Sequence, residues 1–274
     1  MKLCRFQLLE FSASNVSRSS REVHPEPRGG IIEGETVWEI QGELWGRRDR
    51  TGNSWPLEAA KLLPPSAPSK IVCVGKNYVD HATEMGGPPP KEPILFLKPP
   101  SSINAPEDPV VMPKISHRVD YEGEIAAVIG RHCYHLRADE DPAPYILGYT
   151  CFNDVTARDL QKLDGQWTRG KSFDTFCPFG PVLETNPPPA DTRVETFVNG
   201  VKKQSARLSE MIFSVDVIIR FIAQVMTLEP GDLIATGTPA GIGPVVAGDV
   251  MEVSVTGIGT LRNPVISSAE ILEE

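Results

Sequence analysis

Clusters of proline divide this chain of 274 residues into short apolar segments. The chain has 26 prolines, near twice the usual share of ~5%. They stand together at 64–65, 88–90, 99–100 and 187–189. Proline has no backbone N–H for a sheet ladder and a fixed φ, so these clusters mark loops between short strands. The pattern predicts an α+β fold that is rich in β-structure and has few helices.

The apolar runs between these clusters have the length and composition of strands. We expect strands over residues 71–74, 94–97, 124–129, 146–152, 196–198, 232–235 and 250–255. The first run, Ile-Val-Cys-Val, has no polar interruption, which is typical of a strand buried on both faces.

Two segments predict helices. One follows Asp154, where Thr156 and Asp159 have the spacing of a capping box. The other covers residues 214–226, and Pro230-Gly231 ends that segment. Its apolar spacing predicts a core face made by Val217, Ile218, Phe221, Ile222 and Val225.

The domain organisation follows from a proline-rich segment near residue 65. Residues 1–65 predict a small N-terminal β module, in which Glu33-Gly34-Glu35 turns between two strands of a hairpin. Residues 64–68, Pro-Pro-Ser-Ala-Pro, have the composition of a stiff linker. Residues 66–274 then form the larger domain.

Charge and cysteine content restrict the partners and the compartment. The net charge is −9, which argues against binding to a phosphate backbone, so we expect no nucleic-acid partner. We expect no membrane partner and no signal peptide, because no segment has the ~20 uncharged residues of a membrane span or the features of a leader. Five cysteines without a C-x-x-C pair indicate free thiols and a cytoplasmic protein.

Three acidic residues are candidate metal ligands. Glu122 and Glu124 flank Gly123, and residues i and i+2 of a strand point to the same face. Asp154 follows a second apolar strand and precedes the predicted helix. Three carboxylates without a nearby His or Cys favour Mg²⁺ or Mn²⁺. The residues alone leave two other interpretations open, a solvated acidic strand end for the glutamates and a helix cap for Asp154.

Six motifs then resemble one known family, in the order in which that family has them. The matching segments are Gly75-Lys76-Asn77-Tyr78-Val79-Asp80-His81-Ala82-Thr83-Glu84, Phe96-Leu97-Lys98-Pro99, Glu122-Gly123-Glu124, Asn153-Asp154-Val155-Thr156-Ala157-Arg158-Asp159-Leu160-Gln161, Gly170-Lys171-Ser172-Phe173, and the glycine-rich stretch from Thr236 to Gly243. Together they make residues 70–266 similar to the fumarylacetoacetate hydrolase family.

This resemblance implies a mixed β-roll catalytic domain of the fumarylacetoacetate hydrolase type and a homodimer. It implies that Glu122, Glu124 and Asp154 hold the metal, and that Lys171 adds positive charge at the reacting oxygen. His81 and Glu84 would form the dyad that activates water, and their spacing puts both on one face of a helical turn. Carried over in the same way, the substrate-binding residues would be Lys98, Arg158, Gln161 and Thr238.

One position departs from the pattern of fumarylacetoacetate hydrolases proper. Those enzymes have a further metal carboxylate a little before the catalytic histidine, and the corresponding residue here is Val74. The departure disfavours fumarylacetoacetate itself as the substrate and favours the branch with three carboxylates and smaller substrates.

Three functions are compatible with these residues. The leading expectation is metal-dependent hydrolysis of a C–C bond in an acylpyruvate-like 2,4-diketo acid, giving pyruvate and a carboxylic acid. The alternative is decarboxylation of oxaloacetate or a keto–enol isomerisation of the 2-hydroxymuconate type. In both cases the partner is a small 2-keto acid, whose carboxylate and keto oxygens can chelate a divalent cation. A catalytically silent ligand-binding scaffold is the third interpretation.

Overall fold

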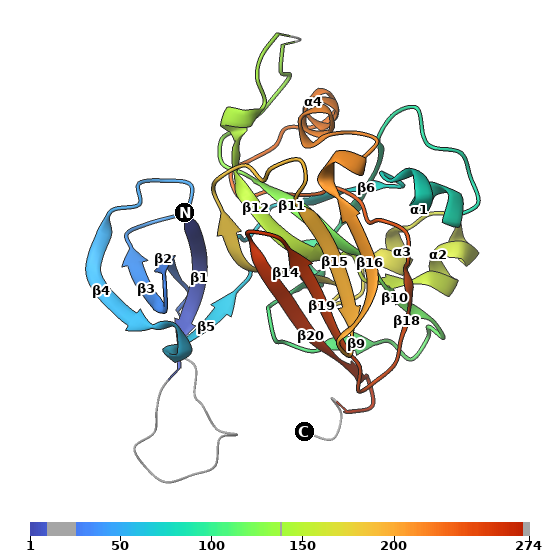
Figure 1. The fold of residues 1–274 in the computed structure, drawn as a ribbon, viewed down its shortest axis with the longest axis horizontal. Helices are drawn as coiled ribbons and strands as arrows, with labels where there is room; N and C mark the ends of the chain where they lie inside the picture. Colours follow the sequence, from blue (N-terminus) through green and yellow to red (C-terminus); the bar gives the residue numbers. More distant parts are fainter. Residues whose placement is uncertain (10–25, 138, 271–274) are drawn as a thin grey trace.

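The computed structural model describes residues 1–9, 26–137 and 139–270. In these residues it has twenty strands in three sheets and four short α-helices, so the β-rich α+β fold predicted from the sequence is confirmed (Figure 1). None of the helices in this part of the chain is both long and apolar enough to cross a membrane.

The largest sheet has twelve strands. They are β1 (Lys2–Leu8), β2 (Arg28–Glu33), β3 (Thr36–Ile40), β4 (Arg50–Pro56), β5 (Ala60–Leu63), β6 (Ile71–Gly75), β7 (Ile94–Lys98), β8 (Ile103–Asn104), β11 (Gly123–Ile129), β12 (Ile146–Asn153), β14 (Cys177–Glu184) and β17 (Leu233–Ala235). The order is β4-β3-β2-β1-β14-β12-β11-β17-β6-β7, with β5 paired to β1 and β8 to β14. Most pairs are antiparallel, whereas β17–β6 and β14–β8 are parallel, so the sheet is mixed.

Two smaller sheets complete the fold. A five-stranded sheet has the order β16-β15-β19-β20-β9, and a three-stranded sheet has the order β13-β10-β18. Their bounds are β9 (Val110–Met112), β15 (Arg193–Val198), β16 (Val201–Arg207), β19 (Val250–Val255), β20 (Gly259–Ser267), β10 (Val119–Tyr121), β13 (Thr156–Ala157) and β18 (Gly243–Val245). Short 3-10 turns cover Leu57–Ala59, Pro100–Ser102, Ala143–Tyr145 and Leu208–Glu210.

The small N-terminal module that the sequence predicts is present as strands β1 to β5, drawn in blue in Figure 1. Its hairpin turns at Gly34, where φ is +57°. The module continues the central sheet, because β1 pairs with β14 through Lys2↔Glu184 and Leu3↔Leu183. The proline-rich segment after it is held in place, since Arg5 donates to the carbonyls of Pro64 and Ser66, each at 3.2 Å.

Strand β11 lies between two apolar cores and is buried along its whole length. Ile125, Ala127 and Ile129 pack with residues of β15 and β19 and with the helix α4 (Val215–Val225). Ala126 and Val128 face the opposite core, which includes residues of β6 and β17. Burial on both faces explains why this strand has an unbroken apolar sequence.

Helix α4 is confirmed, but its predicted core face is wrong in part. The buried residues are Ile218, Ile219, Ile222 and Ala223, whereas Val217 is 46% exposed and Val225 is 62% exposed. The helix is apolar around most of its circumference, so its sequence alone leaves the orientation open. The sheet that it covers decides which side is buried. Ser214 caps its first turn by accepting from the amide of Val217.

The other helices are α1 (Val79–Glu84), α2 (Arg158–Asp164) and α3 (Thr168–Lys171). The capping box expected at the start of α2 does not form. The Thr156 hydroxyl donates to the Asp154 carbonyl at 2.8 Å, and Asp159 accepts from Ser116 Oγ and from the amide of His117. Figure 1 shows α1, α2 and α3 on the side of the molecule opposite the N-terminal module.

Candidate metal and active site

Three buried carboxylates meet where β11 and β12 lie side by side. Gly123 pairs with Asn153 and Glu124 with Phe152, so Glu124 comes close to Asp154, the residue that follows β12. Glu122, between β10 and β11, completes a group whose carboxylate oxygens lie within 4.8 Å of one another. A Cβ at Gly123 would stand 1.9 Å from Thr196 Oγ1, so glycine is required between the two glutamates.

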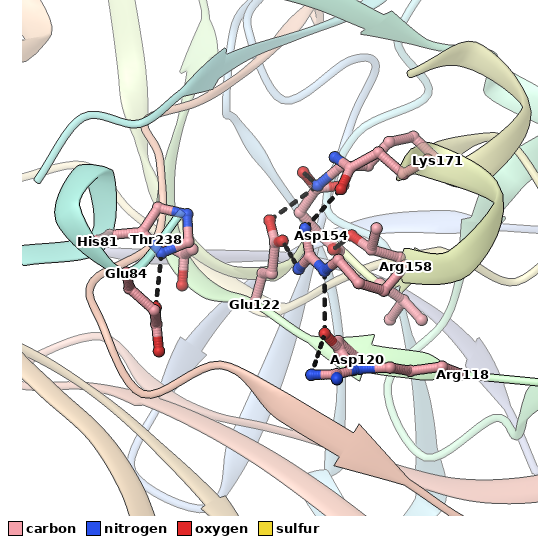
Figure 2. Close-up of polar contacts among 12 residues, drawn as sticks. His81, Glu84, Arg118, Asp120, Glu122, Asp154, Arg158, Lys171 and Thr238 are labelled. Carbon is pink, nitrogen blue, oxygen red and sulfur yellow. Dashed lines mark hydrogen bonds and ion pairs between the residues drawn. The ribbon is translucent and has the colours of Figure 1, made fainter. Parts of the chain in front are cut away.

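Buried cations surround two of the three carboxylates (Figure 2). Lys171 Nζ donates to Glu122 at 2.8 Å and also to Asp154, and Lys98 Nζ donates to Asp154 at 2.6 Å. Arg158 donates to Glu122 through Nη2. These pairs are almost fully buried, so solvent screens them little.

The pKa values of the two glutamates move in opposite directions. Burial disfavours the charged form of Glu122, but the neighbouring charges of Lys171 and Arg158 outweigh it and hold its pKa well below the usual range. Burial together with the negative charges of Asp154 and Glu122 raises the pKa of Glu124 well above its usual value. The protein partner of the Glu124 carboxylate within the described residues is the amide of Gly237, at 2.7 Å.

This donor set fits a divalent cation. It offers hard oxygen ligands from three side chains that converge within 4.8 Å, and the charge of Glu124 has no cationic partner among the described residues. A bound cation would neutralise that charge, as Mg²⁺ and Mn²⁺ do in oxygen-ligand sites. All three carboxylates are buried. This burial argues against the two other interpretations that the sequence left open, a solvated strand end for Glu122 and Glu124 and a helix cap for Asp154.

His81 and Glu84 form a hydrogen-bonded pair on α1. His81 Nδ1 lies 3.0 Å from Glu84 Oε2, and His81 is buried while Glu84 is close to the surface. The other carboxylate oxygen of Glu84 accepts from the amide of Gly241 at 3.1 Å. When Nδ1 carries the proton that Glu84 accepts, Nε2 is left as the basic nitrogen.

The glycine-rich stretch of residues 236–243 closes the site from the other side. The Thr238 hydroxyl donates to the Gly123 carbonyl at 2.9 Å and accepts from Gln204 Nε2 at 2.7 Å. Gly237 donates its amide to Glu124. The stretch thus holds the Glu122-Gly123-Glu124 segment in position.

A small cavity of about 20 Å³ lies against the triad. His81, Arg158, Gln161, Lys171 and Thr238 line it together with the three carboxylates. Val74, Met85, Phe96 and Trp167 provide an apolar wall, and Phe96 meets Trp167 edge-on with ring centroids 5.2 Å apart.

Most of the residues singled out in the sequence converge on this cavity, but their roles remain predictions. Lys98 does not line it: its ammonium donates to Asp154 and to the Val155 carbonyl behind the triad. Glu84 reaches the cavity only through His81. Val74, in place of a fourth carboxylate, contributes to the apolar wall.

The sequence reasoning missed two buried polar residues that support the site. Asp120 is fully buried and accepts from Arg158 Nε at 2.9 Å and from Arg118 Nε at 2.8 Å. Gln204 accepts from the amide of Gly123 at 3.0 Å and donates to Thr238. Asp120 stands two positions before Glu122, so the same i, i+2 spacing could have indicated it. No local signal in the sequence indicates Gln204.

Comparison with known proteins gives two family matches. Residues 70–266 match the family model described as Fumarylacetoacetate (FAA) hydrolase C-terminal. Residues 23–65 match a second one, described as Rv2993c-like, N-terminal.

Curated relatives and solved structures are similar over most of the chain. The human protein named oxaloacetate tautomerase FAHD2A, mitochondrial, is 43% identical over 221 residues, which cover 76% of this chain and 70% of that protein. A 5-carboxymethyl-2-hydroxymuconate delta-isomerase from Mycobacterium smegmatis has a TM-score of 0.85 at 41% identity, covering 98% of this chain and 100% of its own. A 2-hydroxyhepta-2,4-diene-1,7-dioate isomerase from Mycobacterium marinum has a TM-score of 0.85 at 45% identity, covering 98% and 99%.

Proposed function

Because the chain belongs to the fumarylacetoacetate hydrolase family, we propose that it is a metal-dependent tautomerase or isomerase of small 2-keto dicarboxylic acids. The observation that carries the proposal is the oriented His81–Glu84 pair in one cavity with the buried carboxylate triad and Lys171. The names of three relatives support it, since oxaloacetate and the two isomerase substrates are all carboxylic acids that interconvert keto and enol forms or shift a double bond.

In this proposal Glu122, Glu124 and Asp154 hold Mg²⁺ or Mn²⁺. When bound, the cation supplies Lewis acidity toward the keto oxygen and carboxylate of the substrate.

His81 is the base of the proposed reaction. In the enol-forming direction its Nε2 removes the proton from carbon 3 of the 2-keto acid, and the negative charge moves to the oxygen on carbon 2, which takes a proton from solvent to give the enol. Glu84 keeps the ring in the tautomer that leaves Nε2 free and stabilises the imidazolium that forms. In the reverse direction the enol hydroxyl loses its proton to solvent, and the protonated Nε2 delivers a proton to carbon 3.

Lys171 and Arg158 supply positive charge to the substrate oxygens. The Lys171 ammonium has three N–H groups, of which two donate to Glu122 and Asp154, so the third can donate to the oxygen that becomes negative. Arg158 uses three of its five N–H groups on Asp120, Glu122 and Gln161. The other two can bind the substrate carboxylate.

Hydrolysis of an acylpyruvate, which the sequence motifs placed first, is the second candidate. The same His81–Glu84 pair favours it, because an oriented imidazole can take a proton from water as well as from carbon. Decarboxylation of oxaloacetate needs an electron sink but no base, so the His81–Glu84 pair would have no role in that reaction.

The test is turnover of a panel: ketonisation of enol-oxaloacetate, decarboxylation of oxaloacetate, hydrolysis of acetylpyruvate and isomerisation of 2-hydroxyhepta-2,4-diene-1,7-dioate. Each is measured with Mg²⁺, with Mn²⁺ and with excess EDTA. We expect tautomerisation or isomerisation to be fastest and EDTA to abolish it. His81→Ala should lower it by about 10²–10⁴-fold, the usual range for loss of a general base. His117→Ala, at an exposed histidine outside the cavity, is the matched control.

A panel in which acetylpyruvate hydrolysis exceeds tautomerisation by orders of magnitude would favour the second candidate. Full tautomerase activity in excess EDTA would overturn the metal-dependent proposal.

A further inference from the structure

The ammonium of one cationic residue that lines the cavity has no protein partner among the described residues. Lys76, Arg158 and Lys171 are the cationic residues that line the cavity. Arg158 and Lys171 are paired with the buried carboxylates, whereas the Lys76 ammonium has no hydrogen bond or ion pair within the described ranges. The Lys76 charge is therefore available to a ligand.

The backbone holds Lys76 at this place. It follows the last residue of β6 and has a φ of +57°, in the left-handed region that side-chain-bearing residues rarely adopt. The next residue, Asn77, is fully buried, and its side chain donates to the Thr236 carbonyl at 2.7 Å and accepts from the amide of Phe213 at 2.8 Å. Lys76 thus stands between two anchored residues, so its Cα is fixed at the cavity.

An apolar surface lies beside Lys76. Gly75 lies under Trp167, because a Cβ at Gly75 would be 2.5 Å from Trp167 Cζ3. Val74, Phe96 and Trp167 belong to the same cavity wall. The wall suits the carbon chain of a small acid. Lys76 belongs to the same lining as the triad and Lys171, and its Nζ would stand 3.4 Å from a Cβ at Gly87.

The charges support a doubly negative ligand. Four cations, Lys98, Lys171, Arg158 and Arg118, pair with three carboxylates, Glu122, Asp154 and Asp120, whereas Glu124 has no cationic partner among the described residues. The eight side chains carry no net charge when all are ionised. A divalent cation and Lys76 would then add three positive charges, of which a doubly negative ligand would neutralise two.

We propose that Lys76 binds the distal carboxylate of the substrate and makes the enzyme prefer dicarboxylic over monocarboxylic 2-keto acids. This proposal rests on the proposed function, which places the keto-acid end of the substrate at the triad. Lys76 touches the carboxylate that does not react, so it determines specificity and takes no part in proton transfer.

The first test is binding of two unreactive acids of equal chain length, malate and 2-hydroxybutyrate, measured by calorimetry in the presence of Mg²⁺. They share the 2-hydroxy acid group and differ in the distal carboxylate. The wild type should bind malate more tightly by about 10- to 100-fold, the contribution of a charge-assisted hydrogen bond. Lys76→Met should remove that preference and Lys76→Arg should keep most of it. Lys162→Met, at an exposed lysine outside the cavity, should leave it unchanged.

The second test compares the tautomerisation of enol-oxaloacetate with that of enol-phenylpyruvate, a monocarboxylic acid. In Lys76→Met we expect KM for enol-oxaloacetate to rise while kcat/KM for enol-phenylpyruvate stays within about twofold of the wild type.

Three outcomes would each overturn the role of Lys76. The wild type could bind malate and 2-hydroxybutyrate with equal affinity, it could bind both weakly, or the preference for malate could survive in Lys76→Met. Absence of tautomerase activity with the binding preference intact would instead count against the proposed function alone.

Discussion

Replacing Glu124 by glutamine should weaken metal binding without destabilising the metal-free protein. The Glu124 carboxylate lies within 4.8 Å of those of Glu122 and Asp154, and at an effective dielectric constant near 20 each such pair of charges repels by about 3 kcal/mol. Glutamine has the same size and keeps an oxygen that can accept from the Gly237 amide. The substitution therefore removes a repulsive or protonated group, and the melting temperature in EDTA should stay equal or rise.

With metal the same substitution should have the opposite effect. Loss of a charged ligand worth about 3 kcal/mol raises the dissociation constant by roughly 100-fold. At a Mn²⁺ concentration of about 100 times the wild-type Kd, bound metal stabilises the wild type by about 3 kcal/mol. That corresponds to roughly 5–10 °C in Tm for a chain of this size. In Glu124→Gln the shift should fall to about 1 °C.

The assay is scanning calorimetry of both proteins in EDTA and then in Mn²⁺. Glu35→Gln, at an exposed glutamate in the N-terminal hairpin, is the control and should keep the full metal shift. A Glu124→Gln protein that melts several degrees below the wild type in EDTA would contradict the repulsion argument. One that keeps the wild-type metal shift would show that the triad is not the metal site.

Three further predictions concern the support of the site, the cysteines and the assembly. Asp120→Asn should lower the free energy of unfolding in urea by about 3–5 kcal/mol, because it breaks the buried ion pair with Arg158. Arg118→Gln should lower it by less than about 1 kcal/mol, because the Arg118 side chain is 46% exposed. Equal losses in the two variants would contradict this difference. All five cysteines are buried, and burial raises the pKa of Cys4, Cys151 and Cys177 to about 12, so almost no thiolate exists at pH 8. A thiol reagent should then modify the native protein slowly and all five thiols after unfolding in guanidinium, whereas one rapid equivalent would contradict the burial. We also propose a homodimer whose interface includes the edge strand β7, so sedimentation at micromolar concentration should give twice the 30.0 kDa chain mass. Leu97→Lys, at an exposed residue of β7, should shift the sedimenting species toward the monomer. A single 30.0 kDa species in the wild type would refute the dimer.

Local sequence patterns predicted the central strands well because burial on both faces requires unbroken apolar runs. Strands β6, β11 and β12 lie where those runs predicted them. The pairing of β1 with β14 could not be predicted, since it joins residues 180 or more positions apart and depends on no local signal. The orientation of α4 was wrong at Val217 and Val225 for a related reason, because the packed sheet decides which side of an apolar helix is buried.

The site residues were predictable because they stand in short motifs, but their contacts were not. The i, i+2 spacing indicated that Glu122 and Glu124 face one side, and the i, i+3 spacing indicated the His81–Glu84 contact, which the structure has at 3.0 Å. The position of Lys98 behind Asp154 depends on how β7 packs against the end of β12. No short spacing of residues in the sequence indicates that contact. Lys76 belongs to the same motif as His81, and no sequence spacing indicates that it lines the cavity without an ionic partner among the described residues.

The most direct test of the central claim is the ketonisation of enol-oxaloacetate by the wild type, His81→Ala and Glu122→Ala, each with Mg²⁺ and with EDTA. The account predicts a Mg²⁺-dependent rate in the wild type, a loss of about 10²–10⁴-fold in His81→Ala with metal binding intact, and no activity in Glu122→Ala. A wild-type rate that EDTA leaves unchanged, or a His81→Ala enzyme as fast as the wild type, would contradict it.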